Sequence, residues 1–136
     1  MTIKLNPAVA AGGVINEFTT EEAISANEVV AKSETTNRIL KAQASTWDRM
    51  PAFGVATETK SAGETISVIR IGQVTDIARD EDFGYDDRIF VSPNAGKATK
   101  VPPTAVGNIV QTIGRGLNTS DIILQMGWIA PEQKEI

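Results

Sequence analysis

The sequence of 136 residues contains neither cysteine nor histidine. The absence of cysteine excludes disulfide bonds, thiol nucleophiles and thiolate metal ligands. The absence of histidine removes the side chain that most often acts as a general base or binds a transition metal. Carboxylates or lysine could still catalyse a reaction, but these two absences make an enzyme the least favoured class of function. No cofactor is predicted.

Aromatic residues and long apolar stretches are also scarce. Only 5% of the residues are aromatic, so the core must consist mainly of Ile, Val, Leu and Ala. The apolar runs are too short to span a bilayer, and residues 1–5 are not followed by the apolar stretch of a secretory signal. The net charge of −4, without a basic stripe, repels phosphate backbones. We therefore expect neither a membrane nor a nucleic-acid partner.

Short β-branched segments separated by Gly, Pro and Asn dominate the chain from Ile15 onward. Residues 64–71 alternate with apolar side chains on both faces, a pattern typical of a strand that is covered on both sides. Further strands are expected at 28–32, 38–42, 52–57, 88–92, 97–100, 109–114 and 121–126. Strands of this length and spacing predict an all-β fold, a small β-barrel or β-sandwich.

Residues 16–24 permit two interpretations. Thr19 stands three positions before Glu22, which fits the capping box of a helix. The same segment also fits an extended strand with Phe18 and Ile24 packed inward. The strand is favoured because no long period of 3.6 residues follows.

The chain is expected to form a single β domain over residues 15–129. Residues 1–14 contain Pro7 and a Gly-Gly pair, which break regular structure, so this segment is predicted to be a flexible, extended N-terminal arm. Residues 130–136 form a short C-terminal tail in this interpretation.

A faint internal repeat relates residues 28–56 to residues 89–116. Each copy reads as a hairpin, a loop, and a strand that carries one glycine at a crowded or bent position. The glycines are Gly54 and Gly114. The repeat predicts two similar β units packed into one core.

Six carboxylates are concentrated in residues 76–87, at Asp76, Asp80, Glu81, Asp82, Asp86 and Asp87. Clustered carboxylates on a loop suit Ca²⁺, which takes six or more oxygen ligands, and they make Asp80, Asp82 and Asp86 candidate ligands. The spacing does not match an EF-hand loop, however, so a solvated and self-repelling loop is favoured over a metal site. No catalytic residue is predicted here, since adjacent carboxylates on a strand point to opposite faces.

Trp47 lies in a polar loop, and Trp128 lies just past the last expected strand. Aromatic side chains in such positions are frequent anchors at protein interfaces. The alternative is that each tryptophan seals one end of a barrel. Because so few aromatic residues are present, we expect at least one of the two to contact a partner.

Several turn and strand motifs lie between residues 53 and 126. They read FGVA at 53–56, SAG at 61–63, FGYDDRIFVS at 83–92, AGK at 95–97, VQTIG at 110–114 and DIIL at 121–124. Together they resemble motifs of the capsid decoration (cement) and head-fibre proteins of tailed bacteriophages. The motifs cover a little over half of the chain and contain no catalytic signature.

The resemblance implies a β-barrel or tulip-like domain that binds the major capsid protein on the outer capsid surface, often as a homotrimer. Such a protein is made in the host cytoplasm and resides in the virion. The expected partner contacts are Ile3, Leu5, Pro7, Val9, Val14, Trp47 and Trp128. The acidic insertion at 80–87 and the longer N-terminal region depart from the shortest family members, which leaves the docking mode open.

Two other classes of binding protein remain as alternatives. A tail, baseplate or fibre-adaptor component of the virion would share the fold but would bind a ring-shaped assembly. A carbohydrate-binding module would need exposed aromatic platforms, and the low aromatic content disfavours it.

Overall fold

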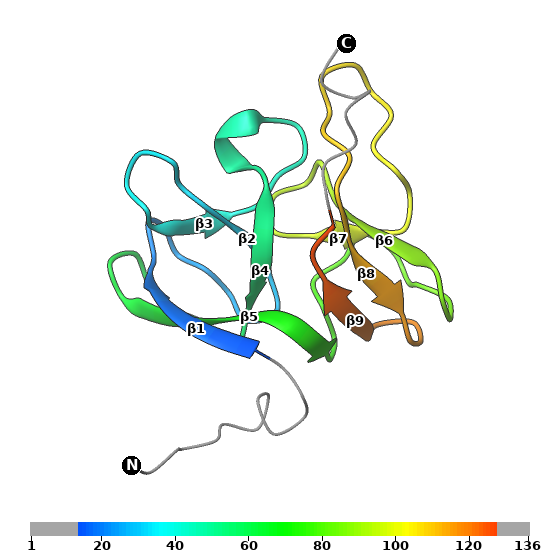
Figure 1. Ribbon diagram of the computed structural model, residues 1–136, viewed down its shortest axis with the longest axis horizontal. Helices are drawn as coiled ribbons and strands as arrows, with labels where there is room; N and C mark the ends of the chain where they lie inside the picture. The colour runs from blue at the N-terminus through cyan, green and yellow to red at the C-terminus, as the bar shows by residue number, and fades with distance from the viewer. Residues whose placement is uncertain (1–13, 128–136) are drawn as a thin grey trace.

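The computed structural model of the protein describes residues 14–127 (Figure 1). The predicted arm, apart from Val14, and the predicted tail lie outside the described residues. The strands are β1 (Val14–Thr19), β2 (Val29–Lys32), β3 (Ile39–Lys41), β4 (Ala52–Ala56), β5 (Thr65–Val74), β6 (Arg88–Val91), β7 (Ala98–Thr99), β8 (Thr112–Gly116) and β9 (Ile122–Gln125). A short 3-10 helix, η1, spans Trp47–Arg49.

The predicted all-β class is confirmed, because the described residues form one antiparallel sheet and no α-helix. Nine strands make up this sheet, and it curls into a half-open barrel (Figure 1). Among residues 14–127, no helix combines the length and the apolar character that a membrane span requires.

Strand β5 connects the two parts of the sheet, one formed by β2–β5 and the other by β6–β9. Its residue Ile69 pairs with β1 and β4, whereas Ile71 pairs with β1 and β9. A strand residue has one neighbour on each side, so β4 and β9 both lie on the side of β5 that faces away from β1. The sheet therefore forks at β5, with β4 and β9 as the two branches.

Backbone hydrogen bonds join the two ends of the curled sheet. The N–H of Val29 donates to the carbonyl of Gly96 over 2.8 Å, and the N–H of Gly96 donates to Ala42 over 2.8 Å. A third bond runs from the N–H of Ala44 to the carbonyl of Ser92 over 2.9 Å. These bonds bring the β2–β3 end against the turn that joins β6 and β7, and they close the half-barrel.

The two parts of the sheet have equivalent strand pairing. From one end the sheet has the order β3-β2-β4-β5, and from the other end it has the order β7-β6-β8-β9. The two orders are the same when β2, β3, β4 and β5 are matched in turn with β6, β7, β8 and β9. Gly54 lies opposite Val30, Gly114 lies opposite Ile89, and each pairing is followed by a register shift. A Cβ atom at either glycine would collide with the neighbouring strand. The pairing is thus the same in both predicted repeat segments, while their origin by duplication stays a prediction.

Two apolar clusters stabilise the fold. The larger one fills the interior of the half-barrel, and both parts of the sheet contribute Ile, Val and Ala side chains to it. The smaller one lies on the outer face of β2–β5, where Ile66 and Val68 pack with Ile24 and Phe18. Because Ile69 belongs to the larger cluster, β5 is covered on both faces here, as its alternation predicts.

The segment 16–24 is a strand only as far as Thr19, and no part of it is a helix. The N–H of Thr20 still donates to Glu64 next to β5, but the N–H of Glu21 donates to Ile39 of β3. The chain therefore crosses from one strand to another after Thr20, and this crossing ends β1. Phe18 and Ile24 both contact the smaller cluster, in agreement with the inward packing expected for the strand.

Two predicted strands are shorter or shifted. The strand predicted at 97–100 is limited to β7, because the N–H of Lys100 donates to the Glu81 carboxylate instead of a strand. The strand predicted at 109–114 becomes β8, which begins at Thr112. The N–H of Ile109 donates to a loop carbonyl, so pairing starts later than the apolar pattern indicates.

Gln111 fills the gap between the two branches of the fork and is only 2% exposed. Its Oε1 accepts the N–H of Ala52 over 2.7 Å, and its Nε2 donates to the carbonyl of Ala52 over 3.0 Å. The same Nε2 donates to the carbonyl of Gly127 over 3.2 Å. The side-chain amide thus links the start of β4 to Gly127, two residues after β9.

We predict that Gln111→Leu lowers the free energy of unfolding by about 2–4 kcal/mol, because it leaves the buried backbone groups of Ala52 and the partly buried carbonyl of Gly127 without partners. Chemical denaturation monitored by tryptophan fluorescence measures this loss. The exposed Gln125 of β9 provides the matched control, since Gln125→Leu is expected to change stability by less than about 0.5 kcal/mol. Equal effects of the two substitutions would contradict the role of Gln111.

Candidate functional site

Most of the residues predicted to contact a partner belong to the ends of the chain. Those outside the described residues are Ile3, Leu5, Pro7, Val9 and Trp128. Val14 is the first residue of β1. Trp47 begins η1 in the loop between β3 and β4, and its side chain is 49% exposed.

The Trp47 loop has a defined local structure. Thr46 caps η1 in an extended conformation, and its hydroxyl oxygen accepts the N–H of Asp48 over 3.3 Å. The 3-10 helix has no buried residue. The loop therefore presents its tryptophan to solvent from a structured turn.

An ion pair anchors the other end of this helix. The guanidinium of Arg49 donates to both carboxylate oxygens of Glu22, over 2.6 and 3.3 Å, and to the carbonyl of Lys41 over 3.2 Å. The N–H of Lys41 donates to the same carboxylate over 2.8 Å. Burial opposes ionisation of Glu22, but these hydrogen bonds and the charges of Arg49 and Lys41 outweigh it and lower the pKa of Glu22.

A second loop reaches the same end of the molecule. Residues 100–111 and the Trp47 loop both extend toward the top of Figure 1, and the N–H of Ile109 donates to the carbonyl of Ala44 over 2.8 Å. Val106 of this second loop is 80% exposed. We call Trp47 and Val106, with the loops that carry them, the Trp47 end.

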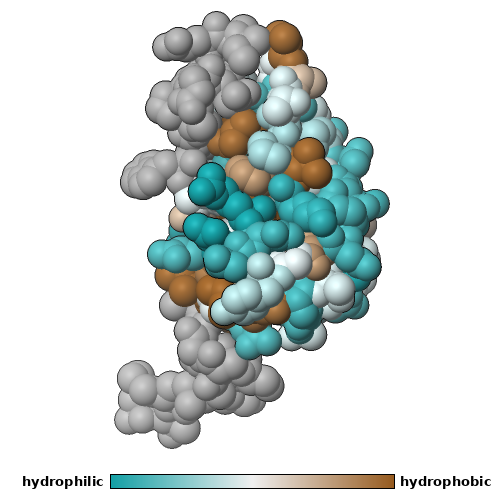
Figure 2. Space-filling view, turned by 90° about the vertical axis from the view of Figure 1, so that its right-hand side faces the viewer, coloured by the Kyte–Doolittle hydropathy of each residue, from teal (hydrophilic) through white to brown (hydrophobic). Residues whose placement is uncertain are grey.

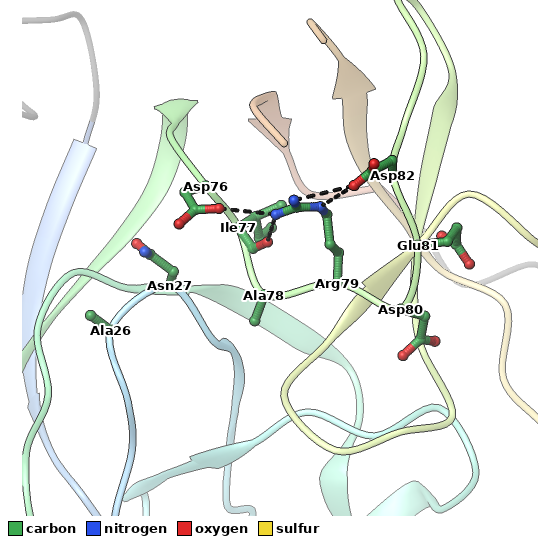
Figure 3. Close-up of a pocket in the computed structure, with 9 residues that line it drawn as sticks. All are labelled: Ala26, Asn27, Asp76, Ile77, Ala78, Arg79, Asp80, Glu81 and Asp82. Carbon is green, nitrogen blue, oxygen red and sulfur yellow. Dashed lines mark hydrogen bonds and ion pairs between the residues drawn. The ribbon is translucent and has the colours of Figure 1, made fainter. Parts of the chain in front are cut away.

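Residues 76–87, which we call the acidic segment, border a surface hollow of about 460 Å³ (Figure 3). The guanidinium of Arg79 lies between Asp76 and Asp82, at 3.0 and 3.3 Å, and also donates to the carbonyl of Ile77. The hydrogen bond to Asp76, followed by that to Asp82, raises the pKa of Arg79 in spite of partial desolvation. Arg79 thus offsets the charge of two carboxylates in the segment.

The three candidate calcium ligands have separate partners. Asp80 accepts hydrogen bonds from the Ser92 hydroxyl and the Asn94 side chain, and Asp82 binds Arg79. Asp86 lies 3.8 Å from Arg115. Within residues 14–127, no three acidic side chains are grouped as a metal site requires. The segment is solvated, as its charge predicts, because the side chains of Asp76, Asp82 and Asp86 are 71–73% exposed. Hydrogen bonds and ion pairs to its neighbours hold it in place.

A surface that the sequence did not indicate lies on the outer face of β6, β8 and β9. Arg88 of β6 is directly opposite Arg115 of β8, and Arg115 is opposite Ile123 of β9. These side chains border a hollow of about 370 Å³, together with Thr112, Gln125 and Met126. We call this surface the arginine face. In the sequence, Arg88 and Arg115 look like unrelated surface charges, because only the register of β6 and β8 brings them together.

The described surface offers two kinds of contact, the apolar Trp47 end and the mixed cationic and apolar arginine face. Figure 2 shows the side of the molecule to the right in Figure 1, where hydrophilic side chains dominate and apolar patches lie between them. Comparison of the chain with models of protein families and with curated proteins finds no match.

We predict that Glu22→Gln lowers the free energy of unfolding by roughly 0.5–1 kcal/mol at pH 7, since the pair with Arg49 is partly exposed to solvent. The pKa of Glu22 is lowered in the folded state, so its stabilisation is complete above its ordinary value near 4.5. This stabilisation disappears as the pH falls through the lowered pKa.

Urea denaturation of both proteins at pH 7, 5 and 3 tests this expectation. The difference between wild type and Glu22→Gln should shrink at the lowest pH. The exposed Glu34 supplies the control, because Glu34→Gln removes the same charge at a position without an ion pair among the described residues. A constant difference across the pH range would contradict the assigned role.

Proposed function

We propose that the chain is a structural protein of a tailed-bacteriophage virion, which decorates the capsid and stabilises it by binding across major capsid subunits. The observation that carries this proposal is the exposed Trp47 end on the curled, half-open β-barrel. The motifs between residues 53 and 126 support it through their resemblance to decoration and head-fibre proteins.

The geometry of the Trp47 end suits a contact surface. The pair between Arg49 and Glu22 fixes the loop before any partner binds, so little conformational entropy is lost on association. A tryptophan in such a position offers a large apolar area, and buried aromatic anchors dominate the energetics of many interfaces. Val106 enlarges the apolar area at the same end.

The proposed mechanism is physical and involves no catalysis. A module that contacts neighbouring capsid subunits resists their separation under the outward load of packaged DNA. Repetition over the lattice, and association as a homotrimer, convert weak single contacts into high avidity. In this proposal the N-terminal arm, from Ile3 to Val14, supplies a second contact.

A role in the tail, baseplate or fibre adaptor is the alternative. The same barrel would then bind a ring in place of a shell, and the copy number in the virion separates the two roles. Quantitative mass spectrometry of the purified particle measures it. A number comparable to that of the major capsid protein supports decoration, and a number as small as that of tail-ring proteins supports the alternative.

We predict that the double variant Trp47→Ser/Val106→Ser binds empty capsids of the parent phage at least about tenfold more weakly than wild type. Co-sedimentation with purified shells measures the affinity. Tyr85 gives the control, because it is highly exposed in the acidic segment and Tyr85→Ser should leave binding unchanged. If wild-type protein fails to sediment with the shells, the proposed function is wrong.

A further inference from the structure

The outer faces of the two equivalent parts of the sheet differ in which side chains they bury and which they expose. Over β2–β5, the smaller apolar cluster covers the face, with Phe18 and Ile24 supplied by the preceding chain segment. Over β6, β8 and β9, the side chains of Arg88, Arg115 and Ile123 are exposed and border the hollow of the arginine face. The fold thus buries apolar side chains on the outer face of β2–β5 and leaves Arg88, Arg115 and Ile123 exposed on the outer face of β6, β8 and β9.

The exposed face carries two cations in an unfavourable arrangement. Arg88 and Arg115 are direct cross-strand partners, and like charges in this position destabilise a sheet. Among the described residues, Arg88 has no carboxylate within ion-pair distance, and Arg115 has only Asp86, at 3.8 Å. An anionic ligand would relieve the repulsion between the two guanidinium groups.

Apolar side chains continue the same face toward β5. Arg88, Arg115, Ile123 and Gln73 are successive cross-strand partners, so they form one row across four strands. Ile71 lies two residues before Gln73 and therefore points to the same side. Ile123 is 42% exposed and Ile71 is 51% exposed. Ile123 lies directly beside Arg115, and Ile71 extends the exposed apolar surface from β9 to β5.

We propose that the arginine face is a docking site for an acidic segment of a protein partner. Carboxylates of the segment pair with Arg88 and Arg115, and an apolar side chain next to them packs on Ile123 and Ile71. The inference rests on the proposed function, in which that partner belongs to the virion. Both edges of β9 are already paired, so the segment lies across the face and does not extend the sheet.

Charge and composition favour a protein ligand over a nucleic acid. The chain has a net charge of −4, and the acidic segment borders the face at Asp86, so a long polyphosphate would be repelled. A ligand with few carboxylates meets only the local charge of the two arginines. The exposed isoleucines add a contact that a phosphate backbone cannot use.

A synthetic peptide of alternating leucine and glutamate serves as the probe, and ¹⁵N–¹H NMR of the whole chain maps its binding. We expect shifts centred on Arg88, Arg115 and Ile123, which weaken as salt is added. The variant Arg88→Glu/Arg115→Glu should bind at least about tenfold more weakly. The matched control Arg38→Glu/Lys97→Glu reverses two exposed charges elsewhere and should bind as wild type does.

Three outcomes would overturn the docking site. They are the absence of peptide binding, equal binding of a leucine–lysine peptide, and stronger binding of a single-stranded oligonucleotide at this face. Since a double charge reversal could affect folding, Arg88→Gln/Arg115→Gln provides a second variant, and thermal unfolding verifies the structure of both.

Co-sedimentation with capsid shells separates this inference from the proposed function. If wild type and Arg88→Glu/Arg115→Glu sediment equally, the docking site is wrong and the proposed function stands. If the peptide maps to the arginine face but wild-type protein never sediments with shells, the docking site stands and the proposed function is wrong.

Discussion

The side-chain amide of Gln111 is the contact that bridges the fork of the sheet at β5. Strand β5 pairs with β4 and β9 on the same side, so these two strands diverge and leave backbone groups between them. An amide offers an acceptor and a donor in one plane, which is the pair that a strand backbone would offer. By bonding to Ala52 and Gly127, Gln111 holds both parts of the sheet around one core.

The curled sheet that results has unlike surfaces. One outer face is covered by the smaller apolar cluster, the other carries Arg88 and Arg115, and the two loops of the Trp47 end extend from a third side. A small barrel that contacts several neighbours in an assembly needs such separate surfaces. The proposed decoration role uses the Trp47 end, and the arginine face offers a further contact with different chemistry.

The sequence predicted much of the fold because the strands have strong local signals. Apolar alternation located β5, and the repeated glycines Gly54 and Gly114 indicated two places where strands are crowded. The role of Gln111 and the arginine face could not be predicted, since both depend on contacts between distant segments. The hydrogen bonds of Asp80 in the acidic segment could not be predicted for the same reason, because its partners come from the turn after β6.

The attachment of β1 gives the protein a directional mechanical response. Six successive residues of β1, from Val14 to Thr19, pair antiparallel with β5, and the chain preceding Val14 joins the strand at one end. A force applied there along the strand axis loads all of these pairs together in shear. A force perpendicular to the sheet opens them one after another. The resistance of β1 to a pull on the preceding chain therefore depends on the direction of the force.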